Sequence, residues 1–249
     1  GRLTAWDKSS GKPFEFRFEP SLGLIEDVTI GSSGGLWIRG GIALRRETGK
    51  TYEIRNRVVV CRCGQSANKP YCDGAHVHVA WDPRLTADDA PLLDNVELTE
   101  GETLSMTDNP KYCVFARFCD AKGQAWNLVG QPENDEAREL AIREASMCPS
   151  GRLMAWDKET GTPYEFRFEP SLGLIEDIAI GASSGLWVRG GIPVSRESGE
   201  TYEIRNRVVL CRCGASHNKP YCDGTHASIR FNDRLEGTPE GKTHPEKVY

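Results

Sequence analysis

The sequence predicts an α+β protein that is mostly β, with two small β-rich domains on either side of an α+β insert. Three observations predict this class: the first and last parts of the chain are copies of one another, each copy alternates apolar and polar residues as strands do, and a helical pattern lies between the copies. We expect domains at residues 1–85, 86–150 and 151–249, the last with a polar C-terminal tail.

An internal duplication organises the chain. Residues 1–85 align without a gap to residues 151–235, and 59 of these 85 positions are identical. The string CRCGQSANKPYCDGAH at 61–76 recurs as CRCGASHNKPYCDGTH at 211–226. Each copy therefore carries three cysteines and one histidine at the same spacing.

Short strands are predicted within each copy. Phe14, Phe16 and Phe18 alternate with charged residues, as a strand with one buried face requires, so we expect these aromatic side chains in the core. The runs LWIRGGIAL and TYEIRNRVVV predict two further strands, joined by a turn at residues 47–49. Together with the many glycines, these strands favour a small β-sandwich-like cap that leads into the cysteine loop.

Composition excludes several classes of partner. The 31 Lys and Arg residues face 36 Asp and Glu residues, and no basic stripe with interleaved aromatic residues indicates nucleic-acid binding. No apolar run approaches the ~18–20 residues that span a bilayer, and no secretory signal is recognisable. We therefore expect no nucleic acid, no membrane and a cytoplasmic location.

The loop at 61–76 brings four potential metal ligands together. Cys61 and Cys63 follow a predicted strand, so their side chains point the same way, about 7 Å apart at the backbone. Cys72 and His76 are four residues apart, and a short helix that opens near Pro70 would place them on one face. Two pairs of ligands from two elements can then converge on one centre.

Three occupants compete for this arrangement. A [2Fe-2S] cluster takes two donors on each iron, which matches a Cys-x-Cys pair and a Cys-x3-His pair. A structural zinc ion accepts three cysteines and one histidine, although zinc loops usually space the first pair by two to four residues. A disulfide would leave the third cysteine and the histidine unused. Spacing alone favours the iron–sulfur cluster only slightly over zinc and leaves all three open.

The loop also resembles a known family. The string C-x-C-x2-S-x3-P-x-C-D-G-x-H, present in both copies, closely resembles the CDGSH iron–sulfur domain, the family of mitoNEET, and departs from the name only at Ala75 and Thr225. The resemblance implies one [2Fe-2S] cluster in each repeat, two in all. The cluster ligands that it implies are Cys61, Cys63, Cys72 and His76 in the first repeat and Cys211, Cys213, Cys222 and His226 in the second.

The resemblance also implies an architecture and a function. The best-known family members are homodimers, so the two repeats are expected to pair inside one chain about a pseudo-twofold axis, as a monomer. One neutral imidazole in place of a thiolate raises the reduction potential above that of all-cysteine plant-type ferredoxins and adds a proton site. We expect a non-enzymatic, proton-coupled electron carrier with an unidentified redox protein as partner. The alternative is a cluster donor to an apo iron–sulfur acceptor, or a redox or pH sensor that releases its cluster through the histidine end.

Other residues near the loops have structural interpretations. Asp73 and Asp223 are interpreted as helix-capping carboxylates. Four cations either offset the charge of a cluster or are simply solvated: Arg62, Lys69, Arg212 and Lys219. Three histidines outside the motif are interpreted as surface residues: His78, His217 and His244.

The middle segment, residues 86–150, is acidic, with 5 Lys and Arg against 13 Asp and Glu. The run NDEARELAIREAS predicts a helix that begins near Asn134 or Asp135 and packs one face against a neighbour. The segment is similar to a divergent single-cluster ferredoxin-like segment, through the string CPSGRL and through three cysteines: Cys113, Cys119 and Cys148. Three ligands suffice for a [3Fe-4S] cluster, but the His and Gly typical of residues 114–118 are missing, so we favour a cluster-free spacer.

The start of the chain matches the start of the second copy. Gly151, Arg152 and Leu153 complete the string CPSGRL, and residues 1–3 have the same sequence, GRL. We therefore expect the full-length gene to encode a second middle-like segment upstream of Gly1.

Overall fold

The structure is a computed structural model that describes residues 3–27, 32–131 and 134–235. It is mostly β with few helices, which confirms the predicted fold class. The elements of the first repeat are β1 (Ala5–Trp6), β2 (Pro13–Phe14), β3 (Ser21–Asp27), β4 (Ser32–Arg39), β5 (Leu44–Arg45), β6 (Arg57–Val60) and the 3-10 helix η1 (Ala75–Val77). No helix of the described part of the chain is long and apolar enough to cross a membrane.

The rest of the chain continues with a mixed segment and a second set of strands. The middle segment contains β7 (Glu97–Glu100), β8 (Leu104–Asp108), η2 (Pro110–Tyr112), η3 (Phe118–Asp120), α1 (Ala125–Val129) and α2 (Asp135–Met147). The elements of the second repeat are β9 (Leu153–Asp157), β10 (Pro163–Tyr164), β11 (Ser171–Asp177), β12 (Ala182–Arg189), β13 (Val194–Ser195), β14 (Arg207–Leu210) and α3 (Thr225–Ser228).

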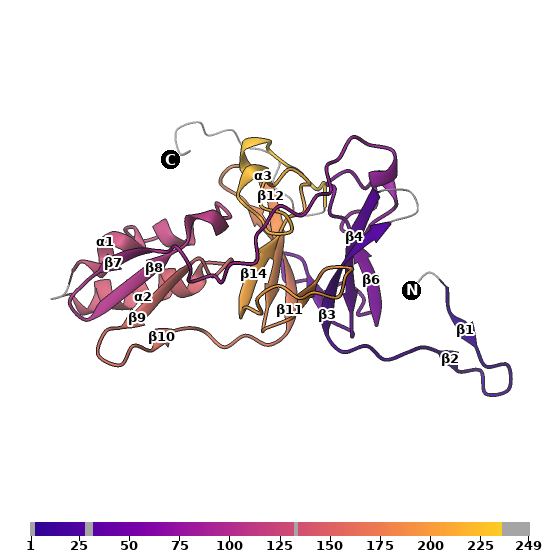
Figure 1. The fold of residues 1–249 in the computed structure, drawn as a ribbon, viewed down its shortest axis with the longest axis horizontal. Helices are drawn as coiled ribbons and strands as arrows, with labels where there is room; N and C mark the ends of the chain where they lie inside the picture. The colour runs from indigo at the N-terminus through magenta and orange to yellow at the C-terminus, as the bar shows by residue number, and fades with distance from the viewer. Residues whose placement is uncertain (1–2, 28–31, 132–133, 236–249) are drawn as a thin grey trace.

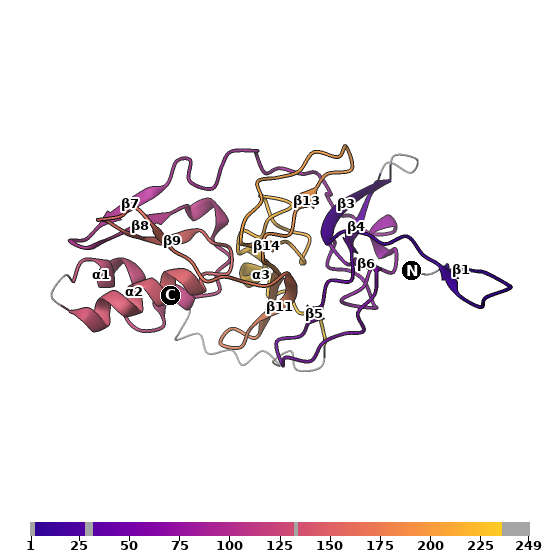
Figure 2. The same ribbon diagram turned by 90° about the horizontal axis from the view of Figure 1, so that it is seen from below.

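The two central sheets exchange strands. Their orders are β13-β3-β4-β6 and β14-β12-β11-β5, so the fourth strand of each sheet comes from the other repeat. β5 runs parallel to β11, with Leu44 opposite Leu172, and β13 runs parallel to β3, with Val194 opposite Leu22. This reciprocal pairing is the intramolecular pseudo-twofold arrangement that the family resemblance implies, and both sheets stand side by side in Figures 1 and 2.

The interface between the repeats is a shared core. Ile38 and Val188, one from each repeat, are at most 1% exposed and belong to one hydrophobic cluster. The cysteine loops also touch: a Cβ on Gly64 would lie 2.4 Å from the carbonyl oxygen of Cys213, and the reciprocal distance from Gly214 to Cys63 is also 2.4 Å. Only glycine fits such an approach, and both glycines have a positive φ as well.

The aromatic residues predicted to lie in the core are largely outside it. Phe14 and Phe16 are 62% and 83% exposed, and Phe166 in the second repeat is 44% exposed. The alternating run forms an arm that leaves the sheet instead of a strand within it. Phe18 alone of the first-repeat set packs inward, edge-to-face with Trp37 at 5.7 Å between ring centroids.

The other predicted strands are shorter than their sequence runs. LWIRGGIAL divides into the end of β4 and the start of β5, and only the last four residues of TYEIRNRVVV form β6. The turn at residues 47–49 is confirmed, because the Gly49 N–H donates to the carbonyl oxygen of Arg46 and the Arg46 N–H to that of Lys50. β6 then leads directly into the cysteine loop, as predicted.

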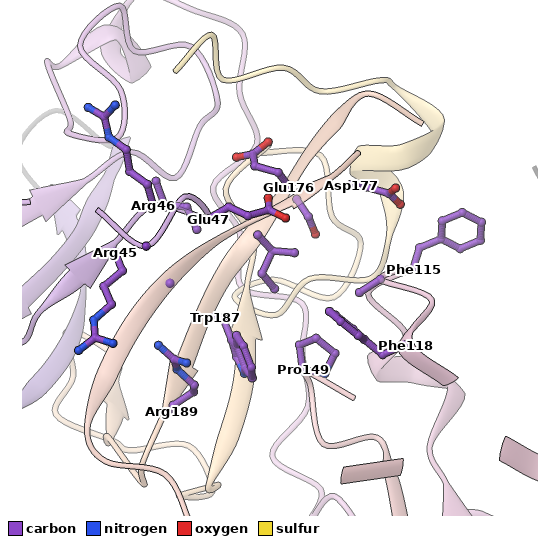
Figure 3. A pocket seen from close by; sticks show the side chains of 16 residues that line it. Arg45, Arg46, Glu47, Phe115, Phe118, Pro149, Glu176, Asp177, Trp187 and Arg189 are labelled. Atoms are coloured by element: carbon purple, nitrogen blue, oxygen red, sulfur yellow. The ribbon is translucent and has the colours of Figure 1, made fainter. Parts of the chain in front are cut away.

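The middle segment builds a sheet together with the second repeat. The antiparallel order β10-β9-β8-β7 joins strands from both sides of residue 150. The predicted helix α2 is confirmed: the side chain of its N-cap residue Asn134 accepts from the Ala137 N–H at 3.1 Å. Ala137, Ala141 and Ala145 are at most 2% exposed and pack on this sheet. The segment also meets both repeats around Trp187 (Figure 3).

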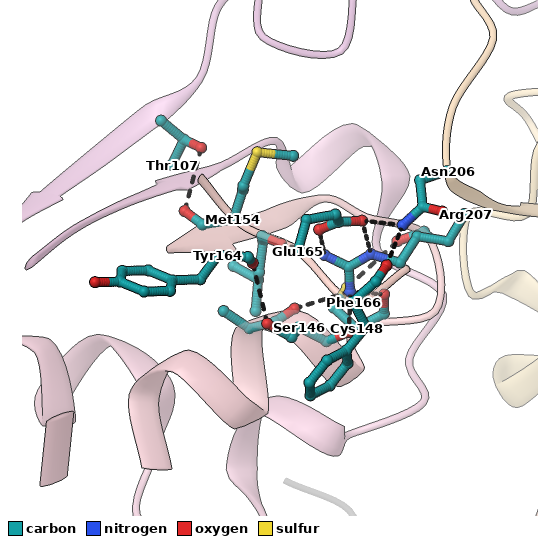
Figure 4. Close-up of polar contacts among 12 residues, drawn as sticks. Thr107, Ser146, Cys148, Met154, Tyr164, Glu165, Phe166, Asn206 and Arg207 are labelled. Carbon is teal, nitrogen blue, oxygen red and sulfur yellow. Dashed lines mark hydrogen bonds and ion pairs between the residues drawn. The ribbon is translucent and has the colours of Figure 1, made fainter. Parts of the chain in front are cut away.

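Arg207 fastens the middle segment to the second repeat. Its side chain is 1% exposed and donates to the carbonyl oxygens of Ala145, Ser146 and Cys148 at the end of α2, and to the carboxylate of Glu165 (Figure 4). The last carbonyl groups of a helix lack intrahelical partners, so the guanidinium supplies the donors that they need.

Candidate metal centres

The first pair of donors in each loop lies directly after a central strand. Cys61 and Cys63 follow β6 with their Sγ atoms 3.7 Å apart, and Cys211 and Cys213 follow β14 with their Sγ atoms 3.8 Å apart. All four side chains are buried. Two thiolates that share one tetrahedral metal ion, each about 2.3 Å from it, have sulfur atoms about 3.7 Å apart. Each pair therefore has the spacing of two ligands on one metal.

The second pair combines sulfur and nitrogen. The Sγ of Cys72 lies 3.6 Å from Nδ1 of His76, and the Sγ of Cys222 lies 3.4 Å from Nδ1 of His226. A thiolate and an imidazole nitrogen on one tetrahedral ion would be separated by about 3.5 Å. The ring nitrogen that faces the thiol is Nδ1 in both repeats, which leaves Nε2 free of the pair.

The helix that was predicted to open near Pro70 starts later. η1 begins at Ala75 and α3 at Thr225, so each second-pair cysteine lies before its helix and the histidine lies within it. The prediction that both donors share one helical face is therefore wrong. The pair instead forms across the turn at Gly74, where φ is +88° and glycine is favoured.

Asp73 and Asp223 hold this turn. Asp73 accepts from the backbone N–H of Ala75 at 3.0 Å and of Ala67 at 2.8 Å, and Asp223 makes the equivalent bonds to residues 225 and 217. These bonds satisfy the free amides at the helix start and link it to the preceding loop. The N-cap residues are Gly74 and Gly224, without a side-chain cap, so the prediction that the two carboxylates cap the helices is wrong, and they stabilise the turn before each helix instead.

The cations near the loops differ in kind. Lys69 and Lys219 donate to loop carbonyl oxygens at 2.6 and 2.7 Å, and their charges help to lower the pKa of Cys61 and Cys211. Arg212 is 4% exposed and pairs with two carboxylates. Arg62 is 5% exposed, so neither arginine is a solvated cation.

In each first pair the pKa of one thiol is lowered, and that of its partner, Cys63 or Cys213, is raised. Hydrogen bonding from Cys63 lowers the pKa of Cys61 to about 6, and hydrogen bonding from Cys213 lowers that of Cys211 to about 7. Burial raises the pKa of Cys222. The thiolate is the form that binds metal, so one cysteine of each first pair is prepared to bind near neutral pH. A positive metal centre would stabilise the thiolate form of the other buried cysteines. The donor sets therefore fit an iron–sulfur cluster.

Comparison with protein families identifies the repeats. Residues 33–77 and 184–227 each match the iron-binding zinc finger of CDGSH type. The chain therefore contains two CDGSH-type segments in tandem. Residues 99–158, between the two CDGSH domains, match the divergent 4Fe-4S mono-cluster family. Neither a curated protein nor a solved structure matches the chain.

The two CDGSH matches confirm the predicted resemblance, and they make the chain an iron-binding protein of the iron–sulfur type. Within the part of the chain that the structure describes, no three His, Cys, Asp or Glu side chains gather closely enough for a single metal ion. Each CDGSH domain presents its four donors as two pairs instead.

The cysteines between the CDGSH domains lie near one another. Cys119, in η3, and Cys148, the C-cap of α2, pack in the same hydrophobic cluster. Burial, with smaller contributions from the charges of Cys148 and Cys113, raises the pKa of Cys119 to about 11. Cys113 lies close to the second CDGSH loop, since its carbonyl oxygen is 3.2 Å from where a Cβ on Gly224 would be.

Residues outside the motif include three histidines and two buried carboxylates that contact the second loop. His78 and His217 are exposed, as predicted, while His244 lies outside the described residues. Sequence reasoning missed the two carboxylates that pair with Arg212, namely Glu176 and Asp233. They lie 36 and 21 residues away, and no local pattern links them to the loop.

Proposed function

We propose that this protein is an electron carrier that holds two [2Fe-2S] clusters, one in each CDGSH domain. The observation that carries the proposal is the division of each donor set into two pairs, with sulfur–sulfur distances of 3.7 and 3.8 Å and sulfur–nitrogen distances of 3.6 and 3.4 Å. A two-iron cluster takes two donors on each iron. In the first domain, Cys61 and Cys63 would hold one iron, and Cys72 and His76 the other.

When bound, such a cluster supplies one-electron transfer, and the residues around it control its reduction potential. A neutral imidazole in place of a fourth thiolate makes the ligand set less negative by one charge, which favours reduction. Lys69, beside the first pair, acts in the same direction. Nδ1 of His76 faces Cys72 and the side chain is half-buried, so Nε2 lies outside the donor pair.

Metal analysis of anaerobically purified protein tests the ligands. We expect two irons and two sulfides for each cluster, and the variants Cys72→Ser and Cys222→Ser should each lose half of the iron because each removes one ligand of one cluster. Cys119→Ser is the matched control and should leave the iron content unchanged, in line with the cluster-free spacer. A folded, colourless protein loaded with zinc would overturn the proposal. Additional iron that Cys119→Ser removes would place a further cluster in the middle segment.

Cluster donation is the second candidate function, and one observation favours it. The Cys72–His76 pair is half-buried, and nothing lies within 4 Å of a Cβ placed on Gly74, so this end of the first loop is open. A ligand that can be protonated from water is the weakest point of such a site.

Visible absorption separates the two functions. The protein is incubated anaerobically with an apo-ferredoxin, and in parallel with a reductase and its electron donor. A carrier retains its absorption with the apo-protein and is reduced and reoxidised repeatedly with the reductase. Transfer of the absorption to the apo-ferredoxin at a rate comparable to reduction would favour the donor. We further propose that the protein acts in the cytoplasm as a monomer with a redox protein as partner, and sedimentation of the purified chain tests the monomer.

A further inference from the structure

A cavity of about 350 Å³ lies where three parts of the chain meet (Figure 3). Its walls come from the turn after β5 in the first repeat, from β11 and β12 in the second repeat, and from the middle segment. Pockets for small molecules measure about 300–1,000 Å³, so this one suits a ligand at the small end of the range. None of the eight proposed cluster ligands lines it.

The body of the cavity is apolar and aromatic. Trp187 on β12, Phe118 in η3 and Pro149 line it from different elements (Figure 3). Phe168 holds the indole ring edge-to-face at 5.8 Å. The indole Nε1 is buried without a hydrogen-bond partner in the described structure. A buried indole N–H usually has an acceptor, so a ligand with an acceptor beside the ring would supply what is missing.

Two guanidinium groups occupy one end of the cavity. Arg45, from β5, and Arg189, from the end of β12, lie on the same side in Figure 3. Burial and then the charge of Arg45 lower the pKa of Arg189. The Cζ of Arg189 lies 4.5 Å from the centroid of the Trp187 ring, and its buried Nε has no partner. Within residues 3–27, 32–131 and 134–235, neither of these arginines pairs with a carboxylate.

A carboxylate fits this end best. Two like charges repel one another, and a carboxylate between them removes the repulsion and accepts two hydrogen bonds from a guanidinium. A purely apolar ligand would leave the two arginines without an anion. An inorganic anion alone would leave the aromatic wall beside Trp187 empty.

The far end of the cavity carries buried oxygen atoms, although Arg212 and Arg117 pair with two of its carboxylates. The side chains of Glu176 and Asp177 are 7% and 6% exposed, and Ser184 is 1% exposed. Each has one oxygen without a hydrogen-bond partner: Oε2, Oδ2 and Oγ, respectively. A hydroxyl or amino group on a ligand would donate to these atoms, because buried oxygens of this kind are normally paired.

We propose that this cavity binds a small planar aromatic carboxylate that carries a hydrogen-bond donor at its opposite end. The carboxylate lies between Arg45 and Arg189, the ring lies against Trp187, and the donor reaches toward Glu176. The site is separate from the cluster loops, and its test does not depend on the proposed electron transfer.

The duplication supplies an internal control for this proposal. The equivalent groove around Trp37 has Arg39 above its indole, with Cζ 4.9 Å from the ring centroid. Ser195 replaces Arg45 there, and Arg196 is already paired with Asp89. No described residue of the middle segment lines that groove. Its second guanidinium is therefore already neutralised, the enclosing aromatic wall is missing among the described residues, and we expect no binding in it.

Isothermal titration of the purified full chain with 6-hydroxy-2-naphthoate tests the proposal, with 2-naphthol as the matched ligand without a carboxylate. We expect one site per chain, and binding of 2-naphthol weaker by at least about tenfold because the ion pairs are lost. Arg45→Ser, which installs the residue of the equivalent groove on an exposed position, should weaken naphthoate binding by at least about tenfold. Arg39→Gln should leave it unchanged.

Three results would overturn the proposal: no binding of the naphthoate up to about 1 mM, equal affinity for 2-naphthol, or equal affinity after Arg45→Ser. Arg189→Gln provides a second variant at the same end and should show the same loss. The visible spectrum and the circular dichroism of each variant report whether it is folded. Two sites per chain, with one abolished by Arg39→Gln, would equally contradict the assignment to this cavity.

Discussion

The two CDGSH domains have nearly the same sequence and nearly the same donor distances, but their surroundings differ. In the first domain, Cys72 and His76 are half-buried, whereas Cys222 and His226 are 3% and 1% exposed. The spacing of the donors is therefore a property of the loop sequence. Their exposure is a property of what lies next to the loop.

The middle segment causes the difference. Val114 packs against Cys222, and Gly224 lies within contact distance of Phe115, since a Cβ there would be 3.3 Å from the Cβ of Phe115. Nothing lies within 4 Å of the equivalent position on Gly74. A single-copy segment can thus make two duplicated sites unequal, because it covers only one of them.

The arms that precede the two sheets show the same contrast. β9 pairs with β8 and supports α2, while β1 and β2 pair only with each other among the described residues. Leu153 is 0% exposed, and its counterpart Leu3 is 84% exposed. The same residues are core in one arm and surface in the other.

The largest expected difference between the copies is at Arg207 and Arg57. Arg207→Ala removes a buried guanidinium that donates to three carbonyl groups at the end of α2 and pairs with the carboxylate of Glu165, so the free energy of unfolding should fall by about 3 kcal/mol. Arg57 lies 3.6 Å from Glu15 and is more exposed, so Arg57→Ala should cost only about 1 kcal/mol. Urea denaturation measures both, and equal losses would show that the middle segment is not held in this way.

The second prediction concerns Glu176, a buried carboxyl group of the second CDGSH domain. Burial raises the pKa of Glu176 to about 7, the charge of Arg212 lowers it, and the charge of Asp233 raises it. Because the folded pKa exceeds the unfolded one, this group stabilises the fold below pH ~4.5, and that contribution is lost as the pH rises through about 7.

Glu176→Gln removes this dependence. Between pH 5 and 8, the wild type should lose about 2 kcal/mol of unfolding free energy relative to the variant. Thermal denaturation across this range measures the difference, and the exposed variant Glu53→Gln serves as control. A difference that is constant with pH would mean that Glu176 is ionised throughout.

Cluster loss should also differ between the domains. Cys222→Ser leaves only the open first site and Cys72→Ser only the covered second site, so iron release to a chelator should be at least about tenfold faster from Cys222→Ser, an effect of about 1.4 kcal/mol on the barrier. Adding Val114→Ser to Cys72→Ser should speed its release, while adding it to Cys222→Ser should not. Equal rates of iron release in the two single variants would contradict the prediction, because release would then not depend on the exposure of the donors.

The smallest expected difference is at the glycines before the two helices. Gly74 and Gly224 have φ values of +88° and +84°, so alanine at either position pays a similar backbone cost of about 1 kcal/mol. At Gly224 the new methyl group also meets the carbonyl oxygen of Cys113 at 3.2 Å. Gly224→Ala should therefore be about 1 kcal/mol more destabilising than Gly74→Ala in thermal denaturation. The reverse order would contradict the covering role of the middle segment.

Features set by neighbours in the sequence could be predicted, and those set by distant contacts could not. The donor pairs follow from the spacing of Cys61, Cys63, Cys72 and His76. The start of α2 follows from Asn134, whose side chain caps the helix. The alternation at residues 14–18 has the same appearance in an exposed arm as in a strand of a sheet, so the sequence could not distinguish the two.

The strand exchange and the cover over the second loop are global features. β5 has an equally suitable partner in either copy, because the residues that it meets are duplicated. Arg212 finds its carboxylates 36 and 21 residues away. Only the folded chain decides such pairings, and they account for the inequality of the two CDGSH domains.

The exchange of β5 and β13 has an evolutionary consequence. Deletion of either copy would remove an edge strand from the sheet of the remaining copy, and only pairing with a second chain could replace it. The covalent tether also keeps the halves together at any dilution, whereas separate subunits would come apart as their concentration falls. Each repeat can therefore diverge in sequence and still remain paired with the other repeat.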